Sequence, residues 1–501
     1  MSQVNSYAQI LKSSSIMGGA AGINLLLGMI RTKFAAVLIG TTGVGLLASF
    51  SAVQGLVGTL FGLGIQSSAV REIAVAVGKG DQNAIGRAVL TLRRICWLTG
   101  LAGMLAIMML SPFISRFTFG SDEYTLDIAA LGVIILFANL SGGQMALIQG
   151  MRRIGDMARA NVYGAIFATF AAVAFYYWLR LRGIVPALVA IAAMQLVLSW
   201  YFARSVPVPS VALTWRQTFS EAGGMVKLGL VFMWNGLLGS AVTYFTVTLI
   251  TQQISLQAVG LYSAAFALSG IFVNFVLNAM GADYYPRLTA VSHDKAAVNR
   301  LVNEQTEIGL LLAIPGLLAT LVLAPWIIQL FYTKEFLQSA ELLQWFILGC
   351  LGRVISWPLG FVMLALGKGR WFLFTETTFN VIHLLLIAMG LFVFGLEGVS
   401  IAFFVMYIGY TLAVYAVARY LTGFDWSSQA KRISVFSLLA MALTYMLLLN
   451  LTVMPATIVG ITLTIVLSLY SLRELVQRVG IHHGIIRLVF KVPGLRLVCG
   501  L

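Results

Sequence analysis

The feature that most constrains this chain is its series of long apolar runs, the first of which extends from Ile16 to Ile39. A helix of about twenty apolar residues crosses a bilayer. Of the 501 residues 60% are hydrophobic and 10% are charged, whereas soluble proteins carry about 25% charged residues. Backbone groups in lipid must bond to one another, and unbroken apolar runs do so as helices rather than as alternating barrel strands. The sequence predicts an all-α polytopic membrane protein.

We predict about fourteen membrane-spanning helices. Their ranges are 13–38, 43–68, 94–112, 128–150, 160–180, 183–203, 226–250, 258–282, 308–331, 341–366, 371–394, 398–419, 433–451 and 455–472. The first residues lack a short apolar core followed by a small-residue cleavage site, so no removed signal peptide is expected.

Lysine and arginine fall mainly on one side of these predicted spans. With the N-terminus placed inside, all but seven of the 32 Lys and Arg residues lie on the inner side. The exceptions are Arg31, Lys33, Arg116, Arg180, Arg182, Lys334 and Arg353. Positive charge accumulates on the cytoplasmic side of membrane proteins, so both termini are predicted to be cytoplasmic. Topology thus explains the net charge of +15, and nucleic acid is not an expected partner.

Weak landmarks of the first half recur in the same order, and at a nearly constant offset in numbering, in the second half. The matched pairs are Val44-Gly45-Leu46 with Val259-Gly260-Leu261, Pro112 with Pro325, Gly150 with Gly367, Gly183 with Gly398, and Ala203-Arg204 with Ala418-Arg419. We therefore predict two parallel six-helix repeats, forming lobes at 1–215 and 216–428, with the site between them. Two extra transmembrane helices occupy 429–472.

Residues 473–501 are basic and are predicted to lie as an amphipathic segment on the inner leaflet of the phospholipid bilayer. His482 and His483 have no further ligand within sequence reach, and the three cysteines are scattered. No metal, cofactor or disulfide framework is predicted. The Gly-Lys-Gly turns around Lys79 and Lys368 lack the phosphate-loop spacing, so the chain is not expected to be an enzyme.

Ionisable residues inside predicted spans are the candidate site residues, because charge in a membrane is costly. Arg31 and Lys33 are separated by about 200° around the first helix, so they face different points. Asn24 lies nearly on the face of Arg31, which makes Arg31 the predicted inward cation. The alternative is that the helix stops near Ile30 and both cations reach the interface.

Arg353 lies about twelve residues from either end of its span, and Glu376 follows on the next helix. We predict that both face the cavity, where Glu376 takes a proton or restrains Arg353. The alternative is that they pair with each other or with carbonyls and only join the two helices. His383, seven residues after Glu376, is either a proton-sensitive neighbour or a packed side chain.

Uncharged polar residues and glycines also occur in the spans. Amides such as Gln54, Gln66 and Asn139 indicate a hydrated interior. The patterns Gly18-x-x-x-Gly22 and Gly58-x-x-x-Gly62 are interpreted as sites where helices pack closely.

Two stretches resemble a known family. GMIRTKFAAVLIGTTGVGLLASFSAVQGL is similar to the opening of polysaccharide-export flippases, and QWFILGCLGRVISWPLGFVMLALGKGRWFLFTETTFN to the tenth and eleventh helices of Wzx-type O-antigen and enterobacterial-common-antigen translocases. Their superfamily includes MATE exporters and MurJ. The resemblance covers about 1–425, whereas the extension at 429–501 departs from the twelve helices of many members.

This resemblance implies a flippase for undecaprenyl-diphosphate-linked oligosaccharide in a bacterial inner membrane, working by ion- or potential-coupled alternating access. It also implies a polysaccharide polymerase and a chain-length regulator as partners. Arginine can grip a diphosphate with two hydrogen bonds. An ion-coupled small-molecule exporter and a non-transport scaffold of a glycan-assembly complex are the alternatives.

Overall fold

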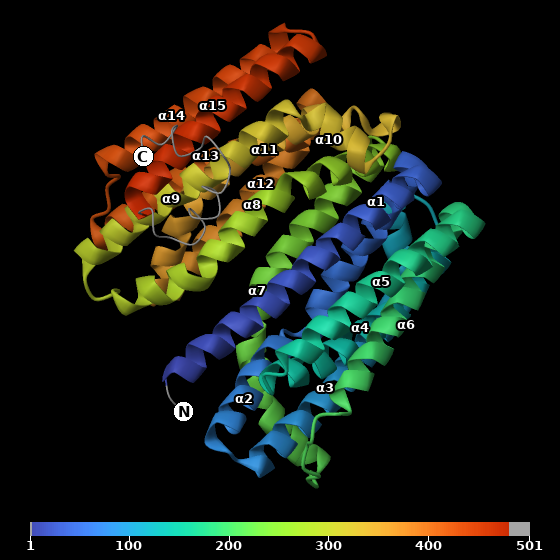
Figure 1. Cartoon of the computed structure of the whole chain (residues 1–501). Helices are drawn as coiled ribbons and strands as arrows, with labels where there is room; N and C mark the ends of the chain where they lie inside the picture. Colours follow the sequence, from blue (N-terminus) through green and yellow to red (C-terminus); the bar gives the residue numbers. More distant parts are fainter. Residues whose placement is uncertain (1–2, 480–501) are drawn as a thin grey trace. The chain divides into compact units, whose positions relative to one another are not determined.

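The computed structural model describes residues 3–479, which form fifteen α-helices and two short 3-10 segments without a β-strand (Figure 1). Twelve stretches within this range are long and apolar enough to cross a membrane. Two of them, Met17–Gly62 and Ile154–Ala203, are of double length, and each covers most or all of two predicted spans. The prediction of an all-α protein with about fourteen spans is confirmed.

The first double-length stretch is α1 (Gln3–Gly62), which is interrupted at Gly40. Gly40 has φ 64° and ψ −167°, a conformation that is open to glycine because it has no Cβ. The interruption lies close to Leu38, whose carbonyl accepts a hydrogen bond from Arg180 Nη1 at 3.1 Å. Arg180 stands at the end of α5 (Ile154–Leu179). The boundary between the first two spans is therefore tied to the end of a helix much later in the chain.

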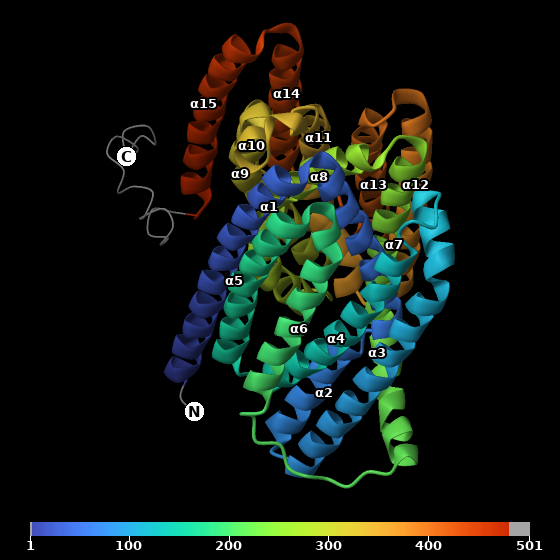
Figure 2. The ribbon, with the colours of Figure 1, turned by 90° about the vertical axis from the view of Figure 1, so that its right-hand side faces the viewer.

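By packing, the chain divides into two compact units. The first unit comprises residues 1–260 and 331–333. Its other helices are α2 (Ile65–Lys79), α3 (Gln82–Phe119), α4 (Thr125–Gly150), α6 (Ile184–Ala203) and α7 (Trp215–Gln253). Helix α3 packs on α4, α1 on α5 and α4 on α6, and Figure 2 shows α1 running beside α5. Helix α7, which the repeat assigns to the second half, packs on α1, α2 and α3.

The second unit comprises residues 261–330 and 334–501. Its helices are α8 (Leu256–Ala290), α9 (Lys295–Val322), α10 (Ala324–Phe331), α11 (Ser339–Ala365), α12 (Gly369–Phe394), α13 (Glu397–Thr422), α14 (Ser428–Asn450) and α15 (Val453–Val479). A core around Tyr284, Val302 and Val362 joins α8, α9 and α11. The Tyr284 hydroxyl donates to the carbonyl of Pro358 at 2.9 Å, which joins α8 to α11 at the helix-interior proline.

Equivalent positions of the predicted repeat share unusual backbone conformations. Arg180 ends α5 with φ 54° and ψ −130°, and its counterpart Gly395 ends α12 with φ 60° and ψ −141°. Arg152 and Gly367 are a second pair at the same offset, with positive φ values of 57° and 69°, so Arg152, rather than the predicted Gly150, is the counterpart of Gly367. Both pairs occupy the same turns of the repeat, so the two halves have kept the same local conformation.

Two glycines of the repeat also contact each other. A Cβ on Gly45 would lie 1.9 Å from the carbonyl oxygen of Leu256, and a Cβ on Gly260 would lie 2.0 Å from that of Thr41. The contact is reciprocal, because each glycine lies against the helix that carries the other. Only glycine permits this backbone approach, since real Cβ contacts are never so short.

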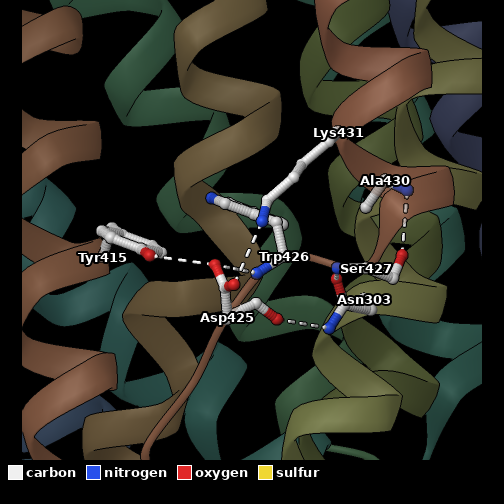
Figure 3. Close-up of polar contacts among 7 residues, drawn as sticks. All are labelled: Asn303, Tyr415, Asp425, Trp426, Ser427, Ala430 and Lys431. Carbon is white, nitrogen blue, oxygen red and sulfur yellow. Dashed lines mark hydrogen bonds and ion pairs between the residues drawn. The ribbon is translucent and has the colours of Figure 1, made fainter.

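The extension packs on the second unit. Helices α14 and α15 lie against each other and against α9 (Figure 2). In the connection before α14, Asn303 Nδ2 donates to the carbonyl of Asp425 at 3.1 Å, and Asn303 Oδ1 accepts from the amide of Ser427 at 2.8 Å (Figure 3). Ser427 caps α14 through the amide of Ala430. One asparagine of α9 thus fixes the point at which the extension begins.

Helix α15 continues to Val479, beyond the predicted end of its span at 472. Arg478 explains this, because it bonds to Glu474 Oε2 at 2.6 Å and to Glu307 Oε2 of α9 at 3.3 Å. The remainder of the predicted amphipathic tail, including His482 and His483, lies outside the described residues.

Candidate functional site

The sequence-predicted site residues fall into two groups. Asn24, Arg31 and Lys33 lie on α1 in the first unit, whereas Arg353 on α11 and Glu376 and His383 on α12 lie in the second. Among residues 3–479 no three His, Cys, Asp or Glu side chains come close enough together to hold a metal ion.

The cations of α1 have different surroundings. Helix α1 runs past Ile30 to Gly40, so the alternative in which the helix stops at Ile30 is wrong. Lys33 Nζ donates a hydrogen bond to the backbone carbonyl of Tyr332. Arg31 is exposed on the helix and lies within electrostatic reach of the buried Tyr176 of α5. Its guanidinium has no carboxylate within 4.0 Å in the described part of the chain.

Asn24 is half-buried two helical turns before Arg31. Its Oδ1 is shielded from solvent, and none of the described groups donates a hydrogen bond to it. An unpaired buried acceptor costs about 1–3 kcal/mol unless a donor reaches it. Asn24 Oδ1 is therefore free to accept a hydrogen bond from a donor group of a bound molecule.

In the second unit Glu376 is bonded to a tyrosine rather than to Arg353. The Tyr410 hydroxyl of α13 donates to Glu376 Oε1 at 2.6 Å. The side chains of Arg353 and Glu376 are not within 4.0 Å of each other in the described structure. The alternative in which the two form a direct ion pair is therefore not observed.

Tyr407 of α13 is close to both of these charged residues. Its side chain packs on Gly352, where an added Cβ would approach it to 3.1 Å, and its ring meets that of Tyr410 edge-on at 6.2 Å. Both Arg353 and Glu376 act electrostatically on its hydroxyl. Arg353 and Glu376 thus lie in the same aromatic environment of α11, α12 and α13.

His383 is packed rather than bonded. Its Nε2 is buried and has no hydrogen-bond partner among the described residues, and its ring lies 6.0 Å from that of Phe403. This environment favours the packing interpretation of His383 over the proton-sensitive one.

A cavity of about 640 Å³ lies within the first unit. It is lined by Ser51, Gln54, Gly55, Gly58, Thr59 and Gly62 of α1, by Gly64, Gln66 and Ser67 at the start of α2, by Ile135, Ala138 and Asn139 of α4, and by Phe232 and Met233 of α7. None of these lining residues is ionisable. A second cavity, of about 380 Å³, lies between α3, α4 and α6 and includes Arg93 and Arg204.

The larger cavity corrects one sequence interpretation. A Cβ on Gly18, Gly22 or Gly58 would meet nothing within 4 Å, and one on Gly62 would only approach Asn139 Oδ1 at 3.7 Å. The two glycine patterns are therefore not helix-packing sites. A four-residue spacing identifies small residues on one face but not what that face meets, and here Gly58 and Gly62 face the cavity.

Residues 36–341 match a family described as "Polysaccharide biosynthesis protein". The chain belongs to this family. It is 20% identical over 379 residues to the "Lipid III flippase" of Escherichia coli (strain K12), a match that covers 74% of this chain and 88% of that protein. The "Lipid III flippase" of Shigella flexneri matches equally.

Solved structures show the same fold. The "Lipid II flippase MurJ, inward closed conformation" superimposes with a TM-score of 0.69 at 16% identity, covering 93% of this chain and 100% of that one. An inward-facing multidrug resistance MATE family transporter of the MOP superfamily gives a TM-score of 0.66 at 14% identity, covering 82% and 95%. This member of the polysaccharide biosynthesis family is a multi-pass membrane protein with the MurJ- and MATE-like fold.

Proposed function

We propose that this protein is a flippase that moves undecaprenyl-diphosphate-linked oligosaccharide from the cytoplasmic to the periplasmic leaflet of a bacterial inner membrane by alternating access. The family membership and the similarity to the lipid III flippase of Escherichia coli support a lipid-linked substrate. In this proposal both termini are cytoplasmic, and a polysaccharide polymerase and a chain-length regulator receive the product.

The observation that carries the proposal is the pair of cations left without carboxylates in membrane-spanning helices. Within residues 3–479 neither Arg31 nor Arg353 forms an ion pair, and each lies inside a membrane-spanning helix, Arg31 before the interruption of α1 and Arg353 in the middle of α11. An uncompensated charge in a membrane helix is costly and favours entry of an anion. A lipid diphosphate supplies that anion, and a guanidinium binds it with two parallel hydrogen bonds.

Roles for the remaining candidate residues follow. Arg31 is the main diphosphate anchor, and Asn24 continues the polar face of the helix on which it lies. Lys33, which donates a hydrogen bond to the carbonyl of Tyr332, adds positive charge nearby. Arg353 is the candidate anion-binding cation of the second unit. Glu376, held by Tyr410, is the candidate group for ion coupling.

A cation exporter of the MATE type would be expected to carry a membrane carboxylate in the first or seventh predicted helix. Residues 13–62 of α1 and 228–253 of α7 contain no Asp or Glu, which disfavours this alternative. A scaffold role predicts instead that neither arginine matters.

The test is surface glycan in a deletion strain complemented with each variant, with protein level checked by blot. Arg31→Ala and Arg31→Glu are expected to abolish surface glycan, and Arg31→Lys to retain part of it because the charge remains but the planar fork is lost. Arg159→Ala is the matched control, since Arg159 is exposed on α5. Full surface glycan with Arg31→Glu and Arg353→Glu would overturn the proposal.

A further inference from the structure

The larger cavity of the first unit has the size of a ligand site. Its volume of about 640 Å³ falls within the roughly 300–1,000 Å³ of small-molecule pockets. Four elements build it: the end of α1, the start of α2, the middle of α4 and one turn of α7. It therefore belongs to a packed region rather than to a single loop.

Amide side chains that face this cavity have unused hydrogen-bonding capacity. The side chains of Gln54 and Gln66 form no hydrogen bond with any described group in residues 3–479, and neither residue is fully exposed. Asn139 uses only its Nδ2, which donates to the carbonyl of Ile135 at 3.3 Å. Each amide presents donors and an acceptor together, a combination that matches neighbouring hydroxyl groups, which also donate and accept.

The glycines of the cavity create this space. An added Cβ at Gly55 or Gly58 would meet nothing within 4 Å, so these positions leave volume on the cavity side of α1. At Gly142 of α4 a Cβ would instead approach Gln66 Nε2 to 2.1 Å. The absence of a side chain at Gly142 thus lets the Gln66 amide lie against α4, which restricts its orientation.

The character of the lining selects the ligand. None of the fourteen lining residues carries a charge, so the cavity offers no counter-ion to a phosphate. Hydroxyls of Ser51, Thr59 and Ser67 extend the polar surface, and Phe232, half-exposed, offers an aromatic face. A ligand with many hydroxyls and apolar C–H faces but no charge fits this combination.

We propose that this cavity binds uncharged sugar residues of the oligosaccharide, with Gln54, Gln66 and Asn139 as the specificity-determining side chains. The inference rests on the proposed function and adds to it a sugar site separate from the cations that hold the diphosphate. The part of the substrate that differs between glycans is thus recognised by uncharged groups, and the common diphosphate by arginine.

The test uses oligosaccharide released by mild acid from the strain's own lipid-linked precursor. The released oligosaccharide lacks both the lipid and the diphosphate. Its binding to the purified full-length protein is measured by calorimetry in detergent. Gln54→Leu and Gln66→Leu are each expected to weaken binding by about tenfold, the effect of one lost buried hydrogen bond. Gly58→Leu is expected to abolish it by filling the cavity.

Matched controls separate these effects from misfolding. Gln149→Leu makes the same change on an exposed position of α4, and Gly223→Leu adds the same side chain at a glycine of α7 that is open and outside the cavity. Both are expected to bind like the wild type. Arg31→Ala is expected to keep binding of the free oligosaccharide while losing transport of the lipid-linked form.

The two proposals fail in different ways. Two results overturn the sugar site alone. In the first, Gln54→Leu, Gln66→Leu and Gly58→Leu all bind the oligosaccharide as the wild type does. In the second, a wild-type protein that restores surface glycan does not bind the oligosaccharide. Failure of the wild-type gene to restore surface glycan overturns the proposed function. Binding lost in the three cavity variants and kept in both controls supports the sugar site.

Discussion

Arg478 provides a sensitive test of how the C-terminal extension is held. Its guanidinium on α15 bonds to Glu474 Oε2 at 2.6 Å and to Glu307 Oε2 on α9 at 3.3 Å, while Ser427 Oγ donates to Glu307 Oε1 at 2.9 Å. The three charged side chains are only 13–19% exposed. Removal of one partner of a buried ion pair leaves an uncompensated charge and costs about 3–5 kcal/mol.

We therefore expect Arg478→Leu to lower the free energy of unfolding by about 3 kcal/mol, the lower end of that range, because Nη2 of the arginine is buried without a partner among the described residues. The assay is reversible denaturation of the purified protein in mixed micelles. The triple variant Arg478→Leu/Glu307→Gln/Glu474→Gln is expected to recover most of the loss, since it leaves no charge unpaired. Arg473→Leu, an exposed position on the same helix, is expected to change stability by less than about 0.5 kcal/mol.

The result that would refute this reasoning is a triple variant no more stable than Arg478→Leu. The cost would then lie in lost packing of the arginine stem rather than in stranded carboxylates. An Arg478→Leu variant as stable as Arg473→Leu would show that the three groups remain solvated and do not anchor the extension.

Three further predictions concern other parts of the fold. Gly45→Ala is expected to cost about 1–3 kcal/mol or more by overpacking and to reduce the amount of protein in the membrane by blot, whereas Gly58→Ala, which meets open space, is expected to leave it unchanged. Tyr410→Phe removes the 2.6 Å hydrogen bond to Glu376, worth about 0.5–1.5 kcal/mol, and is expected to reduce surface glycan more than Tyr415→Phe does. Equal effects would count against a role for Glu376. Hydrogen bonds from Lys431 and Tyr415 lower the pKa of Asp425, which lies in the connection to α14. A carboxyl whose pKa is lowered in the folded state stabilises the fold above its unfolded-state pKa, and this stabilisation is lost as the pH falls. Asp425→Asn is therefore expected to be less stable than the wild type at pH 7, and denaturation curves should show the difference shrinking below about pH 3.9. A difference independent of pH would exclude this cause.

The sequence predicted the helical class, the number of spans and the repeat, because each depends on features that are local or periodic. Apolar runs predict membrane spans directly. Landmarks such as Gly183 and Gly398 indicate the repeat because they occur in the same order in both halves of the chain. The position of the second span was less accurate. It was predicted to reach residue 68, but α1 ends at Gly62, where Leu63 and Gly64 both take positive φ and the backbone of Gly229 packs closely.

Partners distant in sequence were not predictable. Glu376 and Tyr410 are 34 residues apart, and Glu307 and Arg478 are 171 apart, so no periodicity relates them. Amides at Gln54 and Gln66 were recognised as polar, but their convergence on one cavity depends on how α1, α2 and α4 cross. Glycine spacing near Gly58 gave the wrong interpretation for the same reason.

The interruption of α1 also bears on how the two halves diverged. Arg180 holds the backbone conformation that its counterpart Gly395 holds as a glycine, and a non-glycine residue in such a region costs about 1–3 kcal/mol. The bond from Arg180 to the carbonyl of Leu38 offsets part of that cost, and this carbonyl lies beside the interruption at Gly40. The effects of substitutions at the two positions are therefore expected not to add. In an Arg180→Gly background, a substitution at Gly40 is expected to change the free energy of unfolding by a different amount than in the wild type. Relatives in which position 180 is glycine are accordingly expected to tolerate a wider set of residues at positions 38–40.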